Sequence, residues 1–213
     1  MLDEQPVETT LYSLDESLPE GAERRTGERH LSLLRVGALT IGDRRELCLI
    51  RNISSGGMLV RAYSAVAPGT RVEIELKQGE AIPGAVRWAR NDCLGISFDA
   101  PIDVLGLLAA SEDGPRPRMP RVAVDRTAWV RVESVVHRTR AVDISQGGLK
   151  VDYPGELPVN AEVVVSLVGL DPCQGVIRWR ADGAYGITFN RVIPLPLLVS
   201  WLQDGQARLR AAG

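Results

Sequence analysis

RNISSGGMLVRAY, residues 51–63, has a counterpart later in the chain, AVDISQGGLKVDY, residues 141–153. Asn52 and Asp143 occupy matching places in the two segments and are 91 residues apart (143 − 52). Each segment places Ser and Gly residues between two runs that alternate apolar and polar side chains. Asn and Ser side chains bond back to local backbone and Gly accepts a positive φ, so each segment predicts a tight hairpin between two strands.

A second pair of segments repeats with the same offset. GAVRWARNDCLGISFD at 84–99 matches GVIRWRADGAYGITFN at 175–190, and Trp88 and Trp179 are again 91 residues apart (179 − 88). A constant offset across separate matches indicates duplication of a whole unit. We predict that both tryptophans pack inside their units, because Trp buries a large area in a small domain.

The repeat predicts two tandem domains within the usual size range. The first spans 24–110 and the second 118–213, joined by a linker, SEDGPRP at 111–117, with the Gly, Pro and polar residues of a connection. Residues 1–23 hold seven carboxylates and no basic residue. This composition predicts a disordered acidic tail.

Within each unit the pattern is that of strands. Val72, Ile74 and Leu76 alternate with charged residues, the period of a half-buried strand. Turn residues between such runs predict about six short strands per copy. Each copy then ends in a proline-led apolar segment, 101–110 and 194–210, that predicts a helix. The predicted fold class is all-β with short helices: two tandem six-stranded antiparallel β-barrels, each followed by a C-terminal helix.

Composition excludes several classes of protein. A net charge of −2 gives no global positive field for DNA or RNA, and no apolar run approaches the ~20 residues of a membrane-spanning helix. Three cysteines without a CxxC pair argue against a disulfide framework or a zinc site, and the N-terminus does not resemble a secretory signal. We therefore expect a cytoplasmic protein with no nucleic-acid partner and no membrane insertion.

Catalysis is not expected. His30 and His137 are isolated from any triad or metal-binding pattern, and no P-loop, GxGxxG or HExxH motif is present. We predict no catalytic residue, no metal and no cofactor.

Two short elements are candidates for a binding site. An arginine cluster precedes the first predicted strand, and an (Asp/Asn)-x-Ser-x-x-Gly element forms the predicted hairpin. Taken singly, the cluster can be a solvated segment and the element a structural turn. The residues are Arg24, Arg25, Arg29, Asn52, Ser54 and Gly57.

Together these elements resemble the PilZ family. RTGER at 25–29 is similar to its RxxxR motif and NISSGG at 52–57 to its (D/N)xSxxG motif. VRW at 86–88 and LGISF at 94–98 stand where that family has its closing strands. The resemblance implies a six-stranded barrel followed by a helix. It also implies a ligand, cyclic di-GMP, held between an arginine-bearing arm and the barrel surface.

The chemistry of the residues suits this ligand, which carries two phosphodiesters and two guanines. Guanidinium groups can fork onto phosphate oxygens or onto guanine O6 and N7, and can stack on the base. We assign these roles to Arg25 and Arg29, with Arg24 in support. Stacking of Trp88 or Trp179 on guanine is a secondary alternative to their packing inside the barrels.

The turn would bind the edge of one guanine. Ser54 would use its hydroxyl and Asn52 its amide, while Gly57 would allow close backbone approach. An Asp at this position would have a carboxylate that could accept hydrogen bonds from two guanine N–H groups, and Asn52 lacks that carboxylate.

The second copy departs from the motif. Its turn is complete, but its arm has no RxxxR, and aligning Arg121 with Arg29 places Pro117 opposite Arg25. We expect a degenerate arm and only a possible second site. That site would comprise Arg116, Arg118, Arg121, Asp143, Ser145 and Gly148.

The sequence thus predicts a cyclic di-GMP receptor that signals by conformational change to a downstream protein. The alternative is a PilZ-like adaptor that contacts proteins and does not bind the nucleotide.

Overall fold

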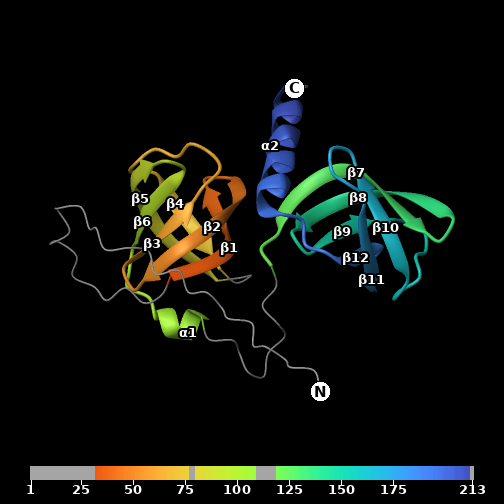
Figure 1. The fold of residues 1–213 in the computed structure, drawn as a ribbon, viewed down its shortest axis with the longest axis horizontal. Helices are drawn as coiled ribbons and strands as arrows, with labels where there is room; N and C mark the ends of the chain where they lie inside the picture. The colour runs from red at the N-terminus through yellow and green to blue at the C-terminus, as the bar shows by residue number, and fades with distance from the viewer. Residues whose placement is uncertain (1–31, 77–79, 109–118, 212–213) are drawn as a thin grey trace, which may run out of the picture.

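The computed structural model describes residues 32–76, 80–108 and 119–211. Within these ranges the chain forms two closed, six-stranded antiparallel barrels, each followed by a helix (Figure 1). The predicted fold class is confirmed. The predicted tail, 1–23, and linker, 111–117, lie outside the described residues, so the predicted domain boundaries stay predictions.

In the first barrel the strands are hydrogen-bonded in the order β1-β2-β3-β6-β5-β4, and β4 pairs with β1 to close the sheet. Closure leaves no free sheet edge. The strands are β1 (Ser32–Ile41), β2 (Arg44–Ser54), β3 (Gly57–Arg61), β4 (Arg71–Glu75), β5 (Ala81–Arg90) and β6 (Cys93–Phe98).

The second barrel repeats this topology, and β10 closes it against β7. Its strands are β7 (Val122–Val132), β8 (Val135–Ser145), β9 (Gly148–Asp152), β10 (Glu162–Leu167), β11 (Cys173–Ala181) and β12 (Ala184–Phe189).

Alternating side chains fill each barrel, as the period of two predicts. In β4, Val72 and Ile74 are buried while Arg71 and Glu73 are exposed. The first barrel's core contains mainly Ile, Val and Leu, and the second adds the buried Tyr185. The apolar area removed from water in these two clusters is the main stabilising contribution to each barrel.

The prediction that Trp88 and Trp179 pack inside the barrels is wrong. Their side chains are 45% and 40% exposed on the outer surface. The strand register shifts just before each of them, between Val86 and Trp88 and at the equivalent place in β11. Such a β-bulge adds one residue and turns the next side chain to the other face.

The first helix begins later than predicted. α1 (Val104–Leu108) begins three residues after Pro101, and the Asp103 carboxylate accepts a hydrogen bond from the Gly106 N–H at 3.1 Å. Asp103 therefore caps the helix. Val104 is buried against the first barrel.

The second helix, α2 (Leu195–Ala211), is close to the predicted range. Leu198 and Trp201 are buried in the second barrel's core. Trp201 is also held by the Arg126 guanidinium, 3.8 Å from the centre of a Trp201 ring. Neither helix in the described part of the chain is long and apolar enough to cross a membrane.

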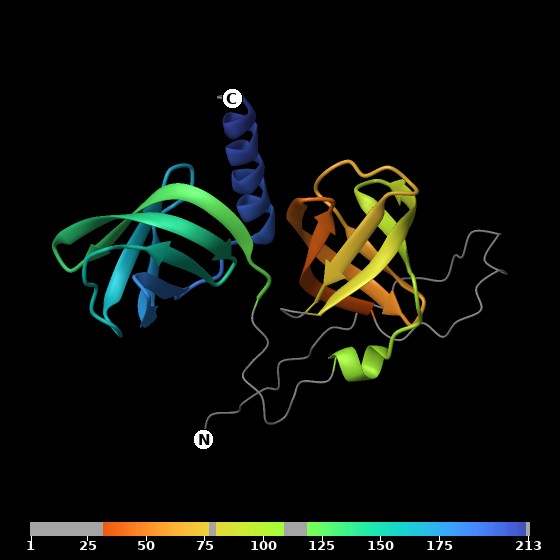
Figure 2. The same ribbon diagram turned by 180° about the vertical axis from the view of Figure 1, so that it is seen from behind.

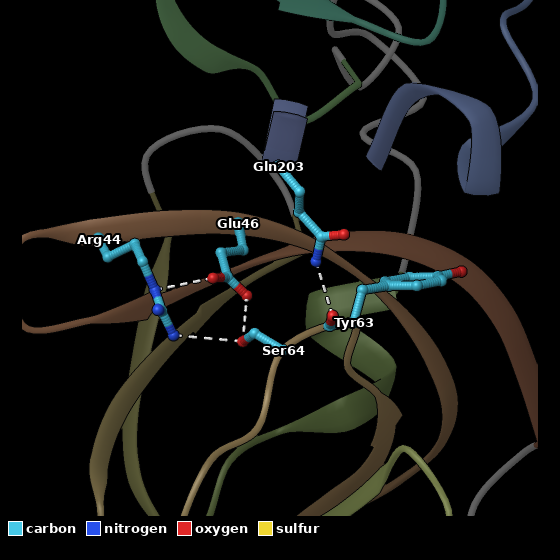
Figure 3. A network of polar contacts seen from close by, with 5 residues as sticks. All are labelled: Arg44, Glu46, Tyr63, Ser64 and Gln203. Carbon is cyan, nitrogen blue, oxygen red and sulfur yellow. Dashed lines mark hydrogen bonds and ion pairs between the residues drawn. The ribbon is translucent and has the colours of Figure 1, made fainter. Parts of the chain in front are cut away.

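Helix α2 stands between the two barrels (Figures 1 and 2). Leu47 of β2 points out of the first barrel, is only 2% exposed, and belongs to the apolar cluster of the second barrel with Val199 and Leu202. The Gln203 side-chain amide donates to the Tyr63 carbonyl at 2.7 Å (Figure 3). The first barrel thus packs directly on the helix of the second.

A polar network borders this contact (Figure 3). The Arg44 guanidinium pairs with Glu46 at 2.7 Å, and the Ser64 hydroxyl donates to the same carboxylate at 2.6 Å. The segment carrying Tyr63 is therefore held to the β1–β2 hairpin.

Cys48 provides a test of the first barrel's core. Burial raises the pKa of its thiol to about 12, so little reactive thiolate forms in the folded protein. At about pH 8 we expect Ellman's reagent to modify the partly exposed Cys93 and Cys173, but Cys48 only after unfolding in guanidinium. Equal rates at all three thiols of the native protein would contradict this packing.

Candidate functional site

The motif forms a two-residue hairpin in both copies. Ser54 ends β2 and pairs with Gly57 at the start of β3, and the Ser54 hydroxyl donates to the Gly57 carbonyl at 3.1 Å. Ser145 makes the same bond to Gly148 at 3.4 Å. The motif serine therefore closes the turn in each barrel.

The motif glycine is required by sheet packing. Neither Gly56 nor Gly57 has a positive φ, so the predicted conformational reason for glycine is wrong. Instead, a Cβ on Gly57 would overlap the backbone oxygen of Ile96 on β6, and one on Gly148 would meet Ile187 in the same way. Close approach of the ligand to the protein backbone at Gly57 stays a prediction.

The turn is also bonded to the segment that leads into each helix. In the first barrel the Ile102 N–H donates to the Ser55 carbonyl at 2.9 Å. In the second, the Ile193 N–H donates to Gln146 at 2.8 Å and the Gln146 amide donates back to the Ile193 carbonyl at 2.9 Å. Because α2 begins at Leu195, the second turn and the helix are directly linked.

Asn52 lies in a row of residues on the outside of the first barrel. It is paired with Leu59, Leu59 with Gly95, and Gly95 with Trp88. Directly opposed residues in antiparallel strands point to the same face. The neighbouring residue Ile53 is fully buried, so this face is the outer one.

Glycine lets the tryptophan lie flat on this face. A Cβ on Gly95 would overlap the Trp88 indole, which therefore covers the glycine. The ring stands two strands from Asn52, which corresponds to roughly 10 Å at about 4.8 Å per strand. An amide and an exposed aromatic ring thus share one surface.

The second barrel repeats this row. Asp143 is paired with Lys150, Lys150 with Gly186, and Gly186 with Trp179, whose indole covers the glycine. The two faces have the same layout, but the second carries a carboxylate and an ammonium where the first has an amide and an alkyl group.

The first arginine arm lies outside the described residues, as do Arg24, Arg25 and Arg29. Its attachment point is described. Ser32, three residues after Arg29, is the backbone partner of Asn52. Three residues span at most roughly 10 Å, so Arg29 is within that reach of the residue that pairs with Asn52.

In the second copy the end of the arm is described and contacts the turn. The Arg121 guanidinium forms an ion pair with the Asp143 carboxylate. Met119 lies over the turn, its Sδ 3.0 Å from where a Cβ on Gly147 would stand. Arg116 and Arg118 lie outside the described residues.

Arg121 also touches the first barrel. Its carbonyl accepts a hydrogen bond from Arg45 Nε at 3.0 Å, and the same Arg45 pairs with Glu75 at 2.8 Å. The second motif is therefore linked to the junction between barrels. Among the described residues, no group of three His, Cys, Asp or Glu side chains is placed to hold a metal ion.

Sequence reasoning missed Lys150 as a residue of the outer face, and it gave Trp88 and Trp179 a role in ligand stacking only as a secondary alternative. A glycine inside a strand marks close approach of another group. Gly95 and Gly186, in LGISF and YGITF, carried that signal.

Gly57→Ala is expected to lower the free energy of unfolding by about 1–3 kcal/mol, because β3 and β6 must separate to admit the methyl group. Gly56→Ala is the matched control, since a Cβ there has no atom within 4 Å. Chemical denaturation measures both variants. Equal stability of the two would contradict a packing role for Gly57.

The solved structures to which the chain is similar include three of low sequence identity. Borreliella burgdorferi PlzA in complex with c-di-GMP is 14% identical, covering 79% of this chain and 86% of that chain, with a TM-score of 0.37. Escherichia coli YcgR in complex with c-di-GMP is 14% identical, covering 84% and 88%, with a TM-score of 0.35. The K. pneumonia MrkH–c-di-GMP complex is 12% identical, covering 84% and 90%, with a TM-score of 0.34.

No curated protein matches the chain. The family model described as "PilZ domain" matches it twice, over residues 23–108 and 115–202. These two matches cover most of the sequence and coincide with the two barrels. The chain therefore belongs to the PilZ domain family, as two tandem PilZ domains.

Proposed function

We propose that this protein is a non-catalytic receptor for cyclic di-GMP. The observation that carries the proposal is the ion pair between Arg121 and Asp143, because it joins an arm arginine to a motif residue on one outer face. The pairing of Ser32 with Asn52 supports the same arrangement in the first barrel. A cytoplasmic location, which the unpaired cysteines favour, is part of the proposal.

On the first face, the proposed contacts divide among three groups. The Asn52 amide binds the edge of one guanine, and the exposed Trp88 indole offers a surface on which a base can stack. Arg25 and Arg29, on the arm that leaves beside Asn52, bind phosphate or the second guanine. The Ser54 hydroxyl, which donates to Gly57 within the turn, keeps its oxygen as an acceptor for the same guanine edge.

The second face is proposed as a further site although its arm has no RxxxR. The Asp143 carboxylate can accept two N–H bonds from a guanine. In the structure the Arg121 guanidinium is paired with that carboxylate. Binding would transfer Asp143 to the guanine and release the Arg121 guanidinium toward a phosphate.

Signalling is proposed to follow the contacts that connect this face to the junction between barrels. One route runs from Arg121 through its carbonyl to Arg45 of the first barrel. Another runs from the turn through Ile193 to α2, whose Gln203 donates to Tyr63. A shift of Arg121 or of the turn therefore changes how the barrels pack, and a downstream protein would recognise the change.

The second candidate function is an adaptor that binds protein and not nucleotide. Asn52 in place of Asp and the incomplete second arm favour it. So does Leu34, whose side chain is 78% exposed beside the first motif strand.

Calorimetric titration with cyclic di-GMP separates the two functions. We expect heat of binding in the wild type, loss of the first site in Arg29→Ala, and loss of all binding in Arg29→Ala/Asp143→Ala. Each substitution removes a charge or hydrogen-bonding group that the ligand requires.

Arg131→Ala is the matched control, because it removes an exposed arginine at the far end of β7. Its binding should equal that of the wild type. A wild type that produces no heat would refute the receptor and favour the adaptor.

Hydrogen exchange tests the proposed signal. Adding cyclic di-GMP should slow exchange at residues 20–30, because the arm closes on the ligand, and should alter exchange in α2. Mass spectrometry with and without ligand measures both regions. Unchanged exchange at 20–30 in protein saturated with ligand would contradict arm closure.

A further inference from the structure

We infer that Lys150 binds a ligand phosphate on the second face, and that Leu59 at the equivalent position leaves the first face without this cation. The inference rests on the proposed function. It assigns a binding residue outside both motifs and a chemical difference between the two faces.

The register places Lys150 in the centre of the second face. Asp143 on β8 and Gly186 on β12 are its direct partners on either side. Its neighbours along β9, Leu149 and Val151, are fully buried. The Lys150 side chain therefore points outward, between the Asp143 carboxylate and the Trp179 indole that covers Gly186.

The charge of Lys150 is available for an anion. Asp143, the nearest carboxylate by register, is engaged by Arg121. Within the described ranges, no carboxylate lies within ion-pair distance of the Lys150 ammonium. The residue is partly buried, so its aliphatic stem lies against the sheet while the charge reaches solvent.

The spacing along this face sets where the parts of the ligand would lie. From Asp143 to the ring over Gly186 the face extends two strand spacings, roughly 10 Å. If one guanine pairs with Asp143 and another base stacks on Trp179, the phosphodiesters that join them lie over the intervening strand, where Lys150 stands. An ammonium is a compact charge with three donors on a flexible stem, suited to a phosphate whose position is set by the bases.

The first face lacks this group. Leu59 occupies the same place between Asn52 and Gly95. The row on the first face therefore offers no cation between Asn52 and Gly95, whereas the row on the second face does. This difference would compensate the second copy for its missing RxxxR.

Lys150→Leu tests the assignment in the Arg29→Ala background, where the remaining heat with cyclic di-GMP reports the second face. We expect roughly three- to tenfold weaker binding at low salt, as for loss of one charge-assisted contact. The affinity should also depend less on salt concentration, because salt screens the attraction between the Lys150 ammonium and the phosphate and the variant lacks that ammonium. Lys150→Arg should retain most of the affinity.

Two further variants complete the experiment. Arg138→Leu removes an equal charge from an exposed outward position on β8, five residues before Asp143, and should leave affinity unchanged. Leu59→Lys, made with Asp143→Ala to silence the second face, should strengthen binding at the first.

The outcomes separate the inference from the proposed function. If the wild type binds cyclic di-GMP but Lys150→Leu keeps the affinity and salt dependence of its background, the inference is overturned and the receptor stands. If the wild type binds cyclic di-GMP but the Arg29→Ala variant does not, the second face binds no ligand and the inference is likewise overturned while the receptor stands. A wild type that does not bind removes the receptor itself.

Discussion

One extra residue in β2 determines which side of the barrel carries the motif. Cys48 and Ile50 point inward, so regular alternation would also bury Asn52. The register shift after Ile50 instead turns Asn52 outward and buries Ile53. Because a one-residue slip exchanges the two faces of a strand, the whole proposed ligand surface depends on this bulge. β8 has the same shift before Asp143.

The bulges also explain what the sequence could and could not predict. The repeat and the alternation of β4 were enough to predict two six-stranded barrels and their terminal helices. Alternation from Val86 places Trp88 inside, and only the backbone irregularity between them places it outside. A bulge does not require a particular residue type. The alternation of apolar and polar residues therefore does not reveal where the bulge lies. The outer row, and Lys150 within it, depends on pairing between strands far apart in sequence.

The two copies differ most where the barrels meet. Leu47 and Leu49 on the outside of β2 pack against the second unit, whereas the equivalent Arg138 and Arg140 of β8 are exposed. The sequence of β2 contains these outward apolar residues. It does not show that α2 packs on them, because α2 lies more than a hundred residues later in the chain. The two barrels share one topology, and this difference in outer surface places the contact between them on β2.

Within the motif itself, the structural roles seen here and the proposed binding role of the outward residue fall on different residues. Ser54 closes the turn and Gly57 admits the Ile96 carbonyl, so the barrel needs both whether or not a ligand binds. The outward residue before them can carry an amide or a carboxylate. Its partner on the next strand can carry an alkyl group or an ammonium. A tandem protein can therefore keep one barrel architecture twice while giving its two faces different charge. That is the difference between Asn52 beside Leu59 and Asp143 beside Lys150.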